Sequence, residues 1–276
     1  MLNFKVHPTQ CTRSGRCAQD CPSRIIEQTG DVLPVIRTEN EELCIRCQHC
    51  LAVCPEAAIE IFGRNPANSI QLNANSFPKL DQMINLVRGR RSIRRYRNEN
   101  VDPALLNQLL SALGNVPTAV NRMDLTFQVI DDKDVMQRLR IKTLTGLQEA
   151  IQAGRIPEQQ AYLVQAVPAW FDKKIDVIFR GAPHMLAVSA GPASICPQED
   201  VNLTLAYFEI LAQSAGLGTV WCGLAKMAME TLPAVKASVG IPDGHYYYTM
   251  LFGLPAVRYS RTVQRDDPGR IHRIQL

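Results

Sequence analysis

The sequence predicts an α+β protein in which a small cysteine-rich domain precedes a larger domain of alternating helices and strands. Two observations support this fold class. Seven of the nine cysteines lie in the first 54 residues, and from about residue 80 onward apolar stripes of helical period alternate with short apolar runs. A chain of 276 residues is long enough for one small and one large domain. We therefore expect a cysteine domain over 1–62, a linker or ordered arm over 63–79, and a larger domain over 80–276.

The cysteine domain contains an internal repeat with a period of 33 residues. This shift superposes three cysteines and a proline of the first copy on identical residues of the second: Cys11 on Cys44, Cys17 on Cys50, Cys21 on Cys54 and Pro22 on Pro55. The second copy reads Cys-x2-Cys-x2-Cys-x3-Cys-Pro. This run binds a [4Fe–4S] cluster in bacterial ferredoxins, and its fourth cysteine ligates the other cluster. The pattern therefore predicts two iron–sulfur clusters and one-electron transfer.

One position breaks the repeat, because Ser14 stands where the second copy has Cys47. The cross-over rule gives one [4Fe–4S] cluster the ligands Cys21, Cys44, Cys47 and Cys50. The other cluster receives Cys11, Cys17, Cys54 and whatever Ser14 can offer. A serine hydroxyl ionises far less readily than a thiol and is a harder ligand. Three alternatives stay open for this second site: a [3Fe–4S] cluster on three thiolates, which we favour, a [4Fe–4S] cluster with Ser14 as a ligand, or an empty site.

Zinc and disulfides are poorer interpretations of these cysteines. Zinc ribbons pair two Cys-x2-Cys knuckles across a longer gap, whereas here three cysteines follow at successive x2 spacings. Disulfides require an oxidising compartment. Each half of the domain should form a short strand, a cluster loop and a short helix after its Cys-Pro pair. Bound metal should supply the stability that so small a core lacks.

Composition excludes several other classes of function. A net charge of +4 is too small to indicate a nucleic-acid-binding protein. The uncharged stretch 210–225 has 16 residues, fewer than the roughly 20 that span a bilayer. Residues 1–11 lack the apolar core of a signal peptide. We therefore expect a cytoplasmic protein with neither nucleic acid nor membrane as a partner.

The larger domain should contain several helices and strands in alternation. Asp102 and Pro103 open a helix as its cap and first residue, and Gly114 closes it. The apolar patterns predict further elements over 80–87 (helix), 125–130 (strand), 131 to about 180 (helical), 185–190 (strand), 202–215 (helix), 219–221 (strand) and 246–252 (strand). The 202–215 helix is apolar nearly all round and should be buried.

No nucleotide-binding glycine motif explains phosphate recognition in this domain. The sequence has no G-x-G-x-x-G after a strand, no G-x-x-x-x-G-K-[ST] and no H-E-x-x-H. The segment Arg90-Arg91-Ser92-Ile93-Arg94 offers an alternative. Its guanidiniums and hydroxyl can form charge-assisted hydrogen bonds to a phosphate dianion. From composition alone, a solvated basic turn is the better interpretation, so other motifs must decide.

Two further motifs accompany this segment: Val-Pro-Thr-Ala-Val-Asn at 116–121 and Gly-Leu-Gly-Thr-Val-Trp-Cys-Gly at 216–223. In order and spacing, the three motifs resemble the nitroreductase family of flavoproteins over about residues 80–265. With the cysteine repeat, the whole chain resembles ferredoxin–nitroreductase fusions. The resemblance implies a ferredoxin-like domain followed by a mixed sheet wrapped by helices. It also implies FMN as cofactor and an intertwined homodimer with FMN at its interface.

The resemblance also implies which residues contact FMN. Arg90, Ser92 and Arg94, with Arg91 beside them, would hold the phosphate, and Arg261 would reach it from the C-terminal tail. The isoalloxazine ring and ribityl chain would be contacted by Pro117, Thr118, Asn121, Trp221, Cys222 and Gly223. Two positions depart from the family pattern: Thr118 stands in place of serine, and Leu254 follows Gly253 where an aromatic residue is usual.

These features predict an FMN oxidoreductase that receives electrons through its own clusters and reduces a small electrophile. The acceptor could be a nitro compound, a quinone or an activated alkene, and the donor a ferredoxin-like protein or NAD(P)H. The reaction would be centred on the flavin, without a catalytic side-chain acid or base. The alternative function is an electron-transfer or redox-sensing module that passes electrons to a partner protein. Cys196 and Cys222 are expected to be small buried hydrophobes rather than reactive thiols.

Overall fold

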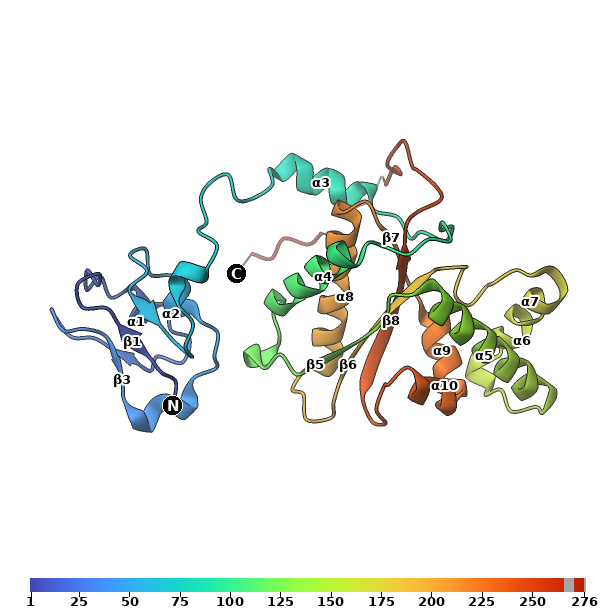
Figure 1. Ribbon diagram of the computed structural model, residues 1–276, viewed down its shortest axis with the longest axis horizontal. Helices are drawn as coiled ribbons and strands as arrows, with labels where there is room; N and C mark the ends of the chain where they lie inside the picture. Colours follow the sequence, from blue (N-terminus) through green and yellow to red (C-terminus); the bar gives the residue numbers. More distant parts are fainter. Residues whose placement is uncertain (266–270, 276) are drawn as a thin grey trace. The chain divides into compact units, whose positions relative to one another are not determined.

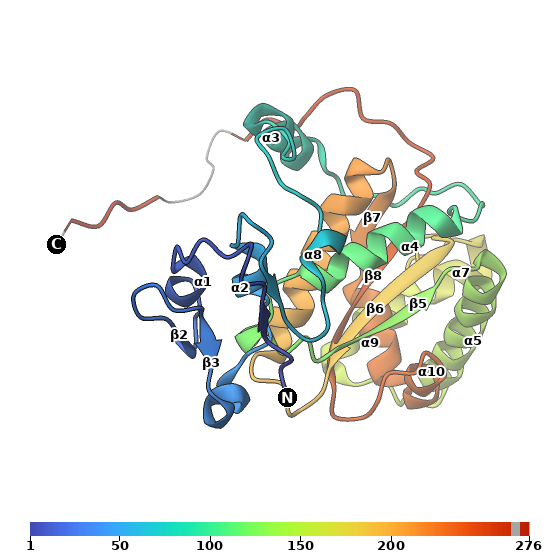
Figure 2. The same ribbon diagram turned by 60° about the vertical axis from the view of Figure 1, so that its left-hand side comes forward.

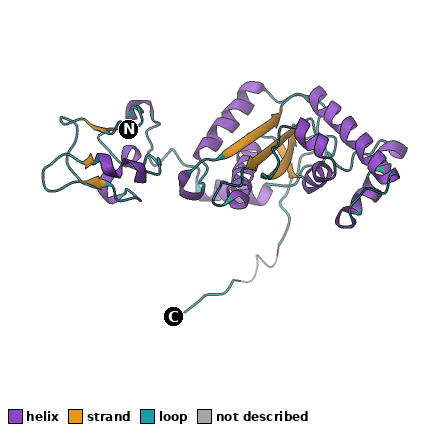
Figure 3. Cartoon of the chain, turned by 90° about the horizontal axis from the view of Figure 1, so that it is seen from below, coloured by secondary structure: helices purple, strands orange, loops and turns teal. Residues whose placement is uncertain are grey.

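The computed structural model describes residues 1–265 and 271–275, so the end of the expected third segment, 266–270 and 276, lies outside the described residues. The chain forms two compact units. The first comprises residues 1–78 with 120–122, and the second comprises 79–119 with the residues from 123 onward. Figure 1 follows the elements of each unit along the chain, and Figure 3 separates helices from strands by colour.

The first unit consists of two similar halves around a small core. Its elements are β1 (Lys5–Val6), α1 (Arg16–Gln19), β2 (Ile26–Glu27), β3 (Val35–Ile36), the 3-10 helix η1 (Thr38–Leu43), α2 (His49–Ala52) and β4 (Ile59–Glu60). Strands β1 and β4 pair antiparallel, as do β2 and β3. The first pairing ties the two ends of the domain together, while Ile25, Ile59 and Ile61 fill the core between the cysteines.

The short helices of this unit lie before the Cys-Pro pairs, so the prediction that they follow them was wrong. Helix α1 ends at Gln19, ahead of Cys21-Pro22, and α2 ends at Ala52, ahead of Cys54-Pro55. A proline disfavours helical backbone at the residue before it, so a helix usually ends at or before that residue. The chain after each proline forms a short strand instead, β2 in the first copy and β4 in the second.

The second unit is built on a four-stranded sheet in the order β5-β6-β8-β7. The strands are β5 (Leu125–Ile130), β6 (His184–Ala190), β7 (Gly218–Trp221) and β8 (Tyr246–Gly253), and every neighbouring pair is antiparallel. A parallel bridge between Ser92 and Thr219 adds an extended segment beside β7 and makes the pairing mixed. The arginine-rich segment is therefore attached to the edge of the sheet.

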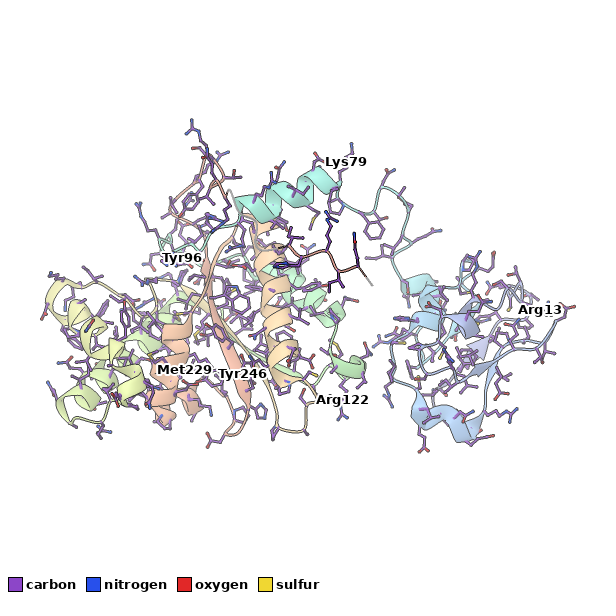
Figure 4. All side chains as sticks on the ribbon, turned by 180° about the vertical axis from the view of Figure 1, so that it is seen from behind. Arg13, Lys79, Tyr96, Arg122, Met229 and Tyr246 are labelled. Atoms are coloured by element: carbon purple, nitrogen blue, oxygen red, sulfur yellow. The ribbon has the colours of Figure 1, made fainter. Side chains whose placement is uncertain are left out.

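Helices cover both faces of this sheet. They are α3 (Leu80–Gly89), α4 (Pro103–Ala112), α5 (Lys133–Gln152), α6 (Tyr162–Ala166), α7 (Pro168–Lys173), α8 (Pro197–Ser214), α9 (Gly223–Thr231) and α10 (Pro233–Ser238). Along β6, Leu186 and Val188 pack against the α4 and α8 side, whereas Met185 and Ala187 pack against the α5 and α9 side. This alternation is the period of a strand buried on both faces. Figure 2 shows the resulting three layers, and Figure 4 labels Met229, a buried residue of α9.

Most predicted elements of this unit are confirmed. Asp102 Oδ1 accepts a hydrogen bond from the N–H of Ala104, and Pro103 is the first residue of α4. The strand over 125–130 has the predicted bounds, and the 202–215 helix begins five residues earlier, at Pro197. Helices α9 and α10 were not predicted, because nine and six residues are too few for a periodic pattern.

Residues 63–79 carry little regular structure. They contain the short 3-10 helix η2 (Pro66–Asn68), capped where Asn65 Oδ1 accepts a hydrogen bond from the N–H of Ala67. The segment is largely exposed and ends where α3 begins at Leu80. Further 3-10 turns lie at η3 (Leu113–Asn115), η4 (Ala119–Asn121) and η5 (Glu158–Gln160). In the part of the chain that the structure describes, no helix combines the length and apolarity that crossing a bilayer requires.

Candidate cluster sites and flavin site

The seven N-terminal cysteines surround two separate hollows in the first unit. One, which we call the second hollow, is lined by four cysteines together with isoleucines that include Ile26, Ile36 and Ile61. Its cysteines are Cys21, Cys44, Cys47 and Cys50. The other, which we call the first hollow, contains Cys11, Ser14, Cys17 and Cys54. The structure thus gathers around each hollow the set of residues that the cross-over rule assigned to each cluster.

Burial makes the cysteine thiols of these hollows poor acids in the absence of a cation. It raises the pKa of Cys17 and Cys44, and that of Cys50 to about 12. The neighbouring sulfurs act in the same direction, since each additional thiolate raises the cost of ionising the next. Ligating thiolates therefore need the positive charge of bound iron, which is the environment that a cluster site provides.

The spacing of these side chains fits a cluster better than a single metal ion. Among residues 1–265 and 271–275, no three His, Cys, Asp or Glu side chains converge as ligands of one ion. A structural zinc site needs four ligands within about 2.0–2.3 Å of one point. Cysteines set around a hollow instead suit a cluster, whose irons are bound by separate thiolates.

In the second unit, the arginine-rich segment is held in extended conformation between two parts of the sheet edge. The N–H of Ile93 donates to the carbonyl of Thr219 at 2.8 Å. Farther along, Arg97 and Leu254 form a backbone hydrogen bond of 2.8 Å. A Cβ on Gly218 would lie 2.7 Å from the Ile93 side chain, so only glycine admits this approach. In an extended segment alternate residues share a face, which places Arg90, Ser92 and Arg94 together.

Arg90 is fixed by a buried carboxylate that the sequence analysis did not single out. One guanidinium nitrogen of Arg90 lies 3.1 Å from Glu209 Oε1 on α8. The same carboxylate accepts hydrogen bonds from Thr219 Oγ1 at 3.3 Å and from the indole N–H of Trp221 at 3.1 Å. Glu209 is only 7% exposed. A lone acid inside the apolar run of α8 was the sequence signal that could have identified it.

Arg94 lines a hollow of about 480 Å³ that carries excess positive charge. Its floor contains the ion pair of Arg140 and Asp176, with Nε and Oδ2 2.6 Å apart. The charges of that pair cancel, which leaves Arg94, Lys174 and Arg180 as a net cationic lining. Lys174 Nζ also lies 6.0 Å from the ring centroid of Trp170. The hollow therefore offers both an aromatic face and cations to a ligand.

Arg91 lies in a different hollow, of about 710 Å³, together with Arg97 and Arg258. The sequence analysis expected Arg261 to be the C-terminal arginine of the site. Arg261 is exposed and lines neither hollow, whereas Arg258 is brought to the arginine-rich segment. The pairing of residues 95–97 with 254–256 causes this placement, since it fixes the tail after β8.

The loop Pro117–Asn121, which was also predicted to contact the flavin, is held by different residues from those that hold the arginine-rich segment. Thr118 Oγ1 accepts a hydrogen bond from the N–H of Met123 at 3.0 Å, and the N–H of Ala119 donates to Asp200 Oδ1 at 3.0 Å. The side chain of Asn121 donates to the carbonyl of Ile45 at 3.1 Å. Because Asp200 and Glu209 lie nine residues apart in α8, this loop and Arg90 are anchored about 14 Å apart along that helix.

The end of β7 places Trp221, Cys222 and Gly223 in succession. Cys222 is buried, and its Sγ donates to the carbonyl of Ile178 at 3.2 Å. Burial raises the pKa of the Cys222 thiol to about 11, so it stays neutral and unreactive near pH 7. Tyr96, labelled in Figure 4, lies in the adjacent extended segment and donates its hydroxyl to the carbonyl of Ile93 at 2.8 Å.

Comparison with protein-family models decides the family. The model of the nitroreductase family matches residues 87–254, more than half of the chain, and that of the 4Fe-4S dicluster domain matches residues 9–59. The chain belongs to the nitroreductase family. It is a nitroreductase-family flavin oxidoreductase with an added two-cluster ferredoxin domain, so the predicted fold class and family are confirmed.

Individual relatives match one part or the other. A putative NADH dehydrogenase/NAD(P)H nitroreductase of Archaeoglobus fulgidus is 24% identical over 198 residues, which are 70% of this nitroreductase-family chain and 98% of the relative. Hydrogenase-4 component A of Escherichia coli is 42% identical over 53 residues, 19% of this chain and 24% of that protein. The chain thus covers about a quarter of the length of this second relative.

Solved structures show the same fold for the larger unit. A nitroreductase with bound FMN from Desulfitobacterium hafniense is similar with a TM-score of 0.55 at 22% identity. The match covers 71% of this chain and all of that one. The part of this chain that the match leaves out is long enough to contain the iron–sulfur domain.

Proposed function

We propose that this nitroreductase-family protein binds FMN, receives electrons through its own iron–sulfur clusters and reduces a small electrophile such as a nitro compound, a quinone or an activated alkene. The observation that carries the proposal is the pair of cysteine-lined hollows in the same chain as the family domain. The expected division is a cluster domain over 1–62, a linker over 63–79 and a flavin domain over 80–276. Because thiolate-bound iron needs a reducing compartment, we place the protein in the cytoplasm.

Arg90, Ser92 and Arg94 are the proposed phosphate ligands. They share one face of an extended segment, and charge-assisted hydrogen bonds from two guanidiniums suit a dianion. Arg91 and Arg261 belong to the same proposed set, with Arg258 added because it lies beside Arg91. The isoalloxazine and ribityl contacts are proposed for Pro117, Thr118, Asn121, Trp221, Cys222 and Gly223. When bound, FMN supplies one-electron and two-electron redox chemistry, which the side chains orient and shield.

Glu209 acts in this proposal as a positioning residue for Arg90. Replacing it by glutamine keeps the volume and an acceptor for Trp221 but removes the charge that orients the guanidinium. We expect Glu209→Gln to weaken FMN binding by about 5- to 30-fold, the equivalent of about 1–2 kcal/mol. Titration of flavin-free protein with FMN measures this, while tryptophan emission reports the altered surroundings of Trp221.

The matched control for this variant is Glu230→Gln. Glu230 is exposed on α9 and pairs with Lys226 one helical turn away. Such a surface pair contributes little to stability, so this change should leave FMN affinity unaltered. Equal affinities for Glu209→Gln and Glu230→Gln would show that Glu209 does not position the phosphate site.

The functional assembly is proposed to be a homodimer. Helix α3 exposes Leu80, Ile84 and Val87 on one face, and α8 exposes Leu203 and Tyr207 one turn apart. An apolar stripe of this kind normally packs against protein. A second copy is the proposed occupant because the predicted flavin contacts fall into two groups about 14 Å apart, which a partner can bring around one FMN. Light scattering should give twice the chain mass; a monomer that retains FMN would overturn this assembly.

The proposal also concerns which molecules donate electrons to this protein and accept electrons from it. The cationic hollow beside Arg94, with Trp170 in its wall, suits an aromatic anion such as NAD(P)H, and the A. fulgidus relative carries that cofactor in its name. The clusters suit a one-electron donor such as reduced ferredoxin. The open hollow also favours an enzyme over the alternative function, an electron-transfer or redox-sensing module with a closed flavin.

One experiment tests this function directly. Anaerobic stopped-flow mixing with NADH, NADPH and reduced ferredoxin should show flavin reduction by at least one donor, followed by reoxidation with a nitro compound or quinone. If a donor reduces the flavin but no small acceptor reoxidises it, the result would favour the alternative function, an electron-transfer module. A protein that is purified without flavin, and binds none when FMN is added, would overturn the proposal.

A further inference from the structure

The cationic hollow beside Arg94 is built from three separate segments of the larger unit. The chain between α3 and α4, helix α5, and α7 with the loop after it all contribute to its lining (Figure 1). Its volume of about 480 Å³ lies within the range of about 300–1,000 Å³ that is typical of sites for small molecules. The lining residues are Arg94, Asn98, Gln137, Arg140, Trp170, Lys174, Ile175, Asp176, Arg180 and Gly181.

The one ion pair in this lining is fully engaged by the protein itself. Among the described residues that line the hollow, Asp176 alone carries a carboxylate. Its oxygens accept hydrogen bonds from Arg140 Nε at 2.6 Å and from the N–H groups of Phe179 and Gly181 at 2.7 and 2.9 Å. The Arg140 guanidinium also donates to the carbonyl of Ala182 at 2.6 Å. Asp176 therefore does not neutralise the other cations of the hollow.

Lys174 and Arg180 remain as cations that pair with no carboxylate in the described part of the chain. Arg94 is a third cation, but the FMN phosphate proposed above would neutralise it. The ring of Trp170 lies beside these charges, with its centroid 6.0 Å from Lys174 Nζ. Such a site suits a planar anion, because the anionic group can pair with the cations while the ring packs against the indole.

The same hollow adjoins the proposed flavin contacts at two points. Arg94, which lines it, is a proposed phosphate ligand. Cys222, a proposed ring contact, donates from Sγ to the carbonyl of Ile178 at 3.2 Å, and Ile178 lies in the loop 176–181 that carries Arg180. A molecule bound in the hollow would therefore lie beside the residues expected to hold the flavin, where an electron acceptor must bind.

We propose that Lys174 and Arg180 select the electron acceptor by its charge, so that the preferred substrate is an aromatic electrophile that carries a carboxylate. A carboxylate is ionised at neutral pH and can pair with both cations. The two residues act on acceptor binding and not on electron transfer itself. This inference rests on the proposed function, which names the electrophile but not its charge.

Two acceptors of similar shape test the selection. The probes are para-nitrobenzoate and para-nitrobenzamide, which differ in the charge of one group. We expect Lys174→Gln with Arg180→Gln to lower the ratio of their kcat/KM values, carboxylate over amide, by about 5- to 30-fold, because two partly exposed charge pairs are lost. The change should lie in KM. Because both acceptors are measured on one preparation, any loss of flavin cancels in the ratio.

The matched control is Lys173→Gln with Arg138→Gln. Both residues are exposed and lie outside the lining of the hollow, so this variant removes the same net charge and should keep the wild-type ratio. Lys174→Glu with Arg180→Glu should lower the ratio further than the glutamine variant, since like charges repel the carboxylate. An unchanged ratio in the glutamine variant, or an equal fall in the control, would overturn the inference.

A binding measurement separates this inference from the proposed function. Calorimetric titration with para-nitrobenzoate should show binding that weakens in the Lys174→Gln, Arg180→Gln variant. Such binding in a protein that reduces no acceptor would support the anion site and contradict the proposed function. Turnover without this binding would overturn only the inference. If the variant altered the KM of NADPH relative to NADH, but not the ratio for the two acceptors, the hollow would bind the phosphate of the donor, which would also overturn it.

Discussion

Replacing Arg90 and Arg94 together with alanine should yield protein that keeps its iron and loses its flavin. Both guanidiniums are proposed to bind the FMN phosphate, and a hydrogen bond to a charged group contributes about 1.5–3 kcal/mol. Loss of both should weaken FMN binding by about 10²- to 10⁴-fold. Absorbance of the released flavin and a colorimetric iron assay on the same sample measure the two cofactors separately.

The matched control removes two charges from the same segment without touching the proposed phosphate ligands. Arg88 and Arg95 are exposed and line neither hollow, and their replacement by alanine should leave FMN at full occupancy. Because Glu209 loses its partner when Arg90 is removed, Arg90→Lys with Arg94→Ala provides a variant that still neutralises the carboxylate. Full FMN occupancy in the double alanine variant would exclude this segment as the phosphate site.

The cluster ligands could be predicted because the cysteines that identify them lie close together in the sequence. The spacing of Cys44, Cys47 and Cys50 and the period of the repeat determine which side chains can reach one cluster. The structure then gathered these residues, with Ser14, around two hollows. Strands such as 125–130 were predictable for a similar reason, since burial on one or both faces leaves a pattern within a few residues.

Residues that act through long-range contacts were not predictable in the same way. Glu209 meets Arg90 across 119 positions of sequence, and no local pattern encodes that pairing. Helix α3 shows a different limit. The period of its apolar residues correctly predicted a helix, but it could not predict that the apolar face is exposed to solvent in the single chain.

The largest stability effect in the larger unit is expected at Asp176. Its carboxylate accepts hydrogen bonds from Arg140 Nε at 2.6 Å, from the N–H of Phe179 at 2.7 Å and from the N–H of Gly181 at 2.9 Å. The two charged side chains are 8% and 6% exposed. Asp176→Ala leaves the buried Arg140 guanidinium without a countercharge, so we expect the free energy of unfolding to fall by about 3–5 kcal/mol. Urea unfolding followed by tryptophan emission measures it, with the exposed Asp172→Ala as control.

A double variant separates the loss of the pair from the cost of the charge left behind. Replacing Arg140 with methionine and Asp176 with leucine removes both charges at once and fills the space with apolar groups. Buried ion pairs replaced in this way often cost nothing or even stabilise, because neither charge then has to be desolvated. The double variant should therefore be more stable than Asp176→Ala alone, even though it has lost more of the native hydrogen bonds. If it were equally unstable, the backbone N–H groups of Phe179 and Gly181, rather than the stranded guanidinium, would be what Asp176 stabilises.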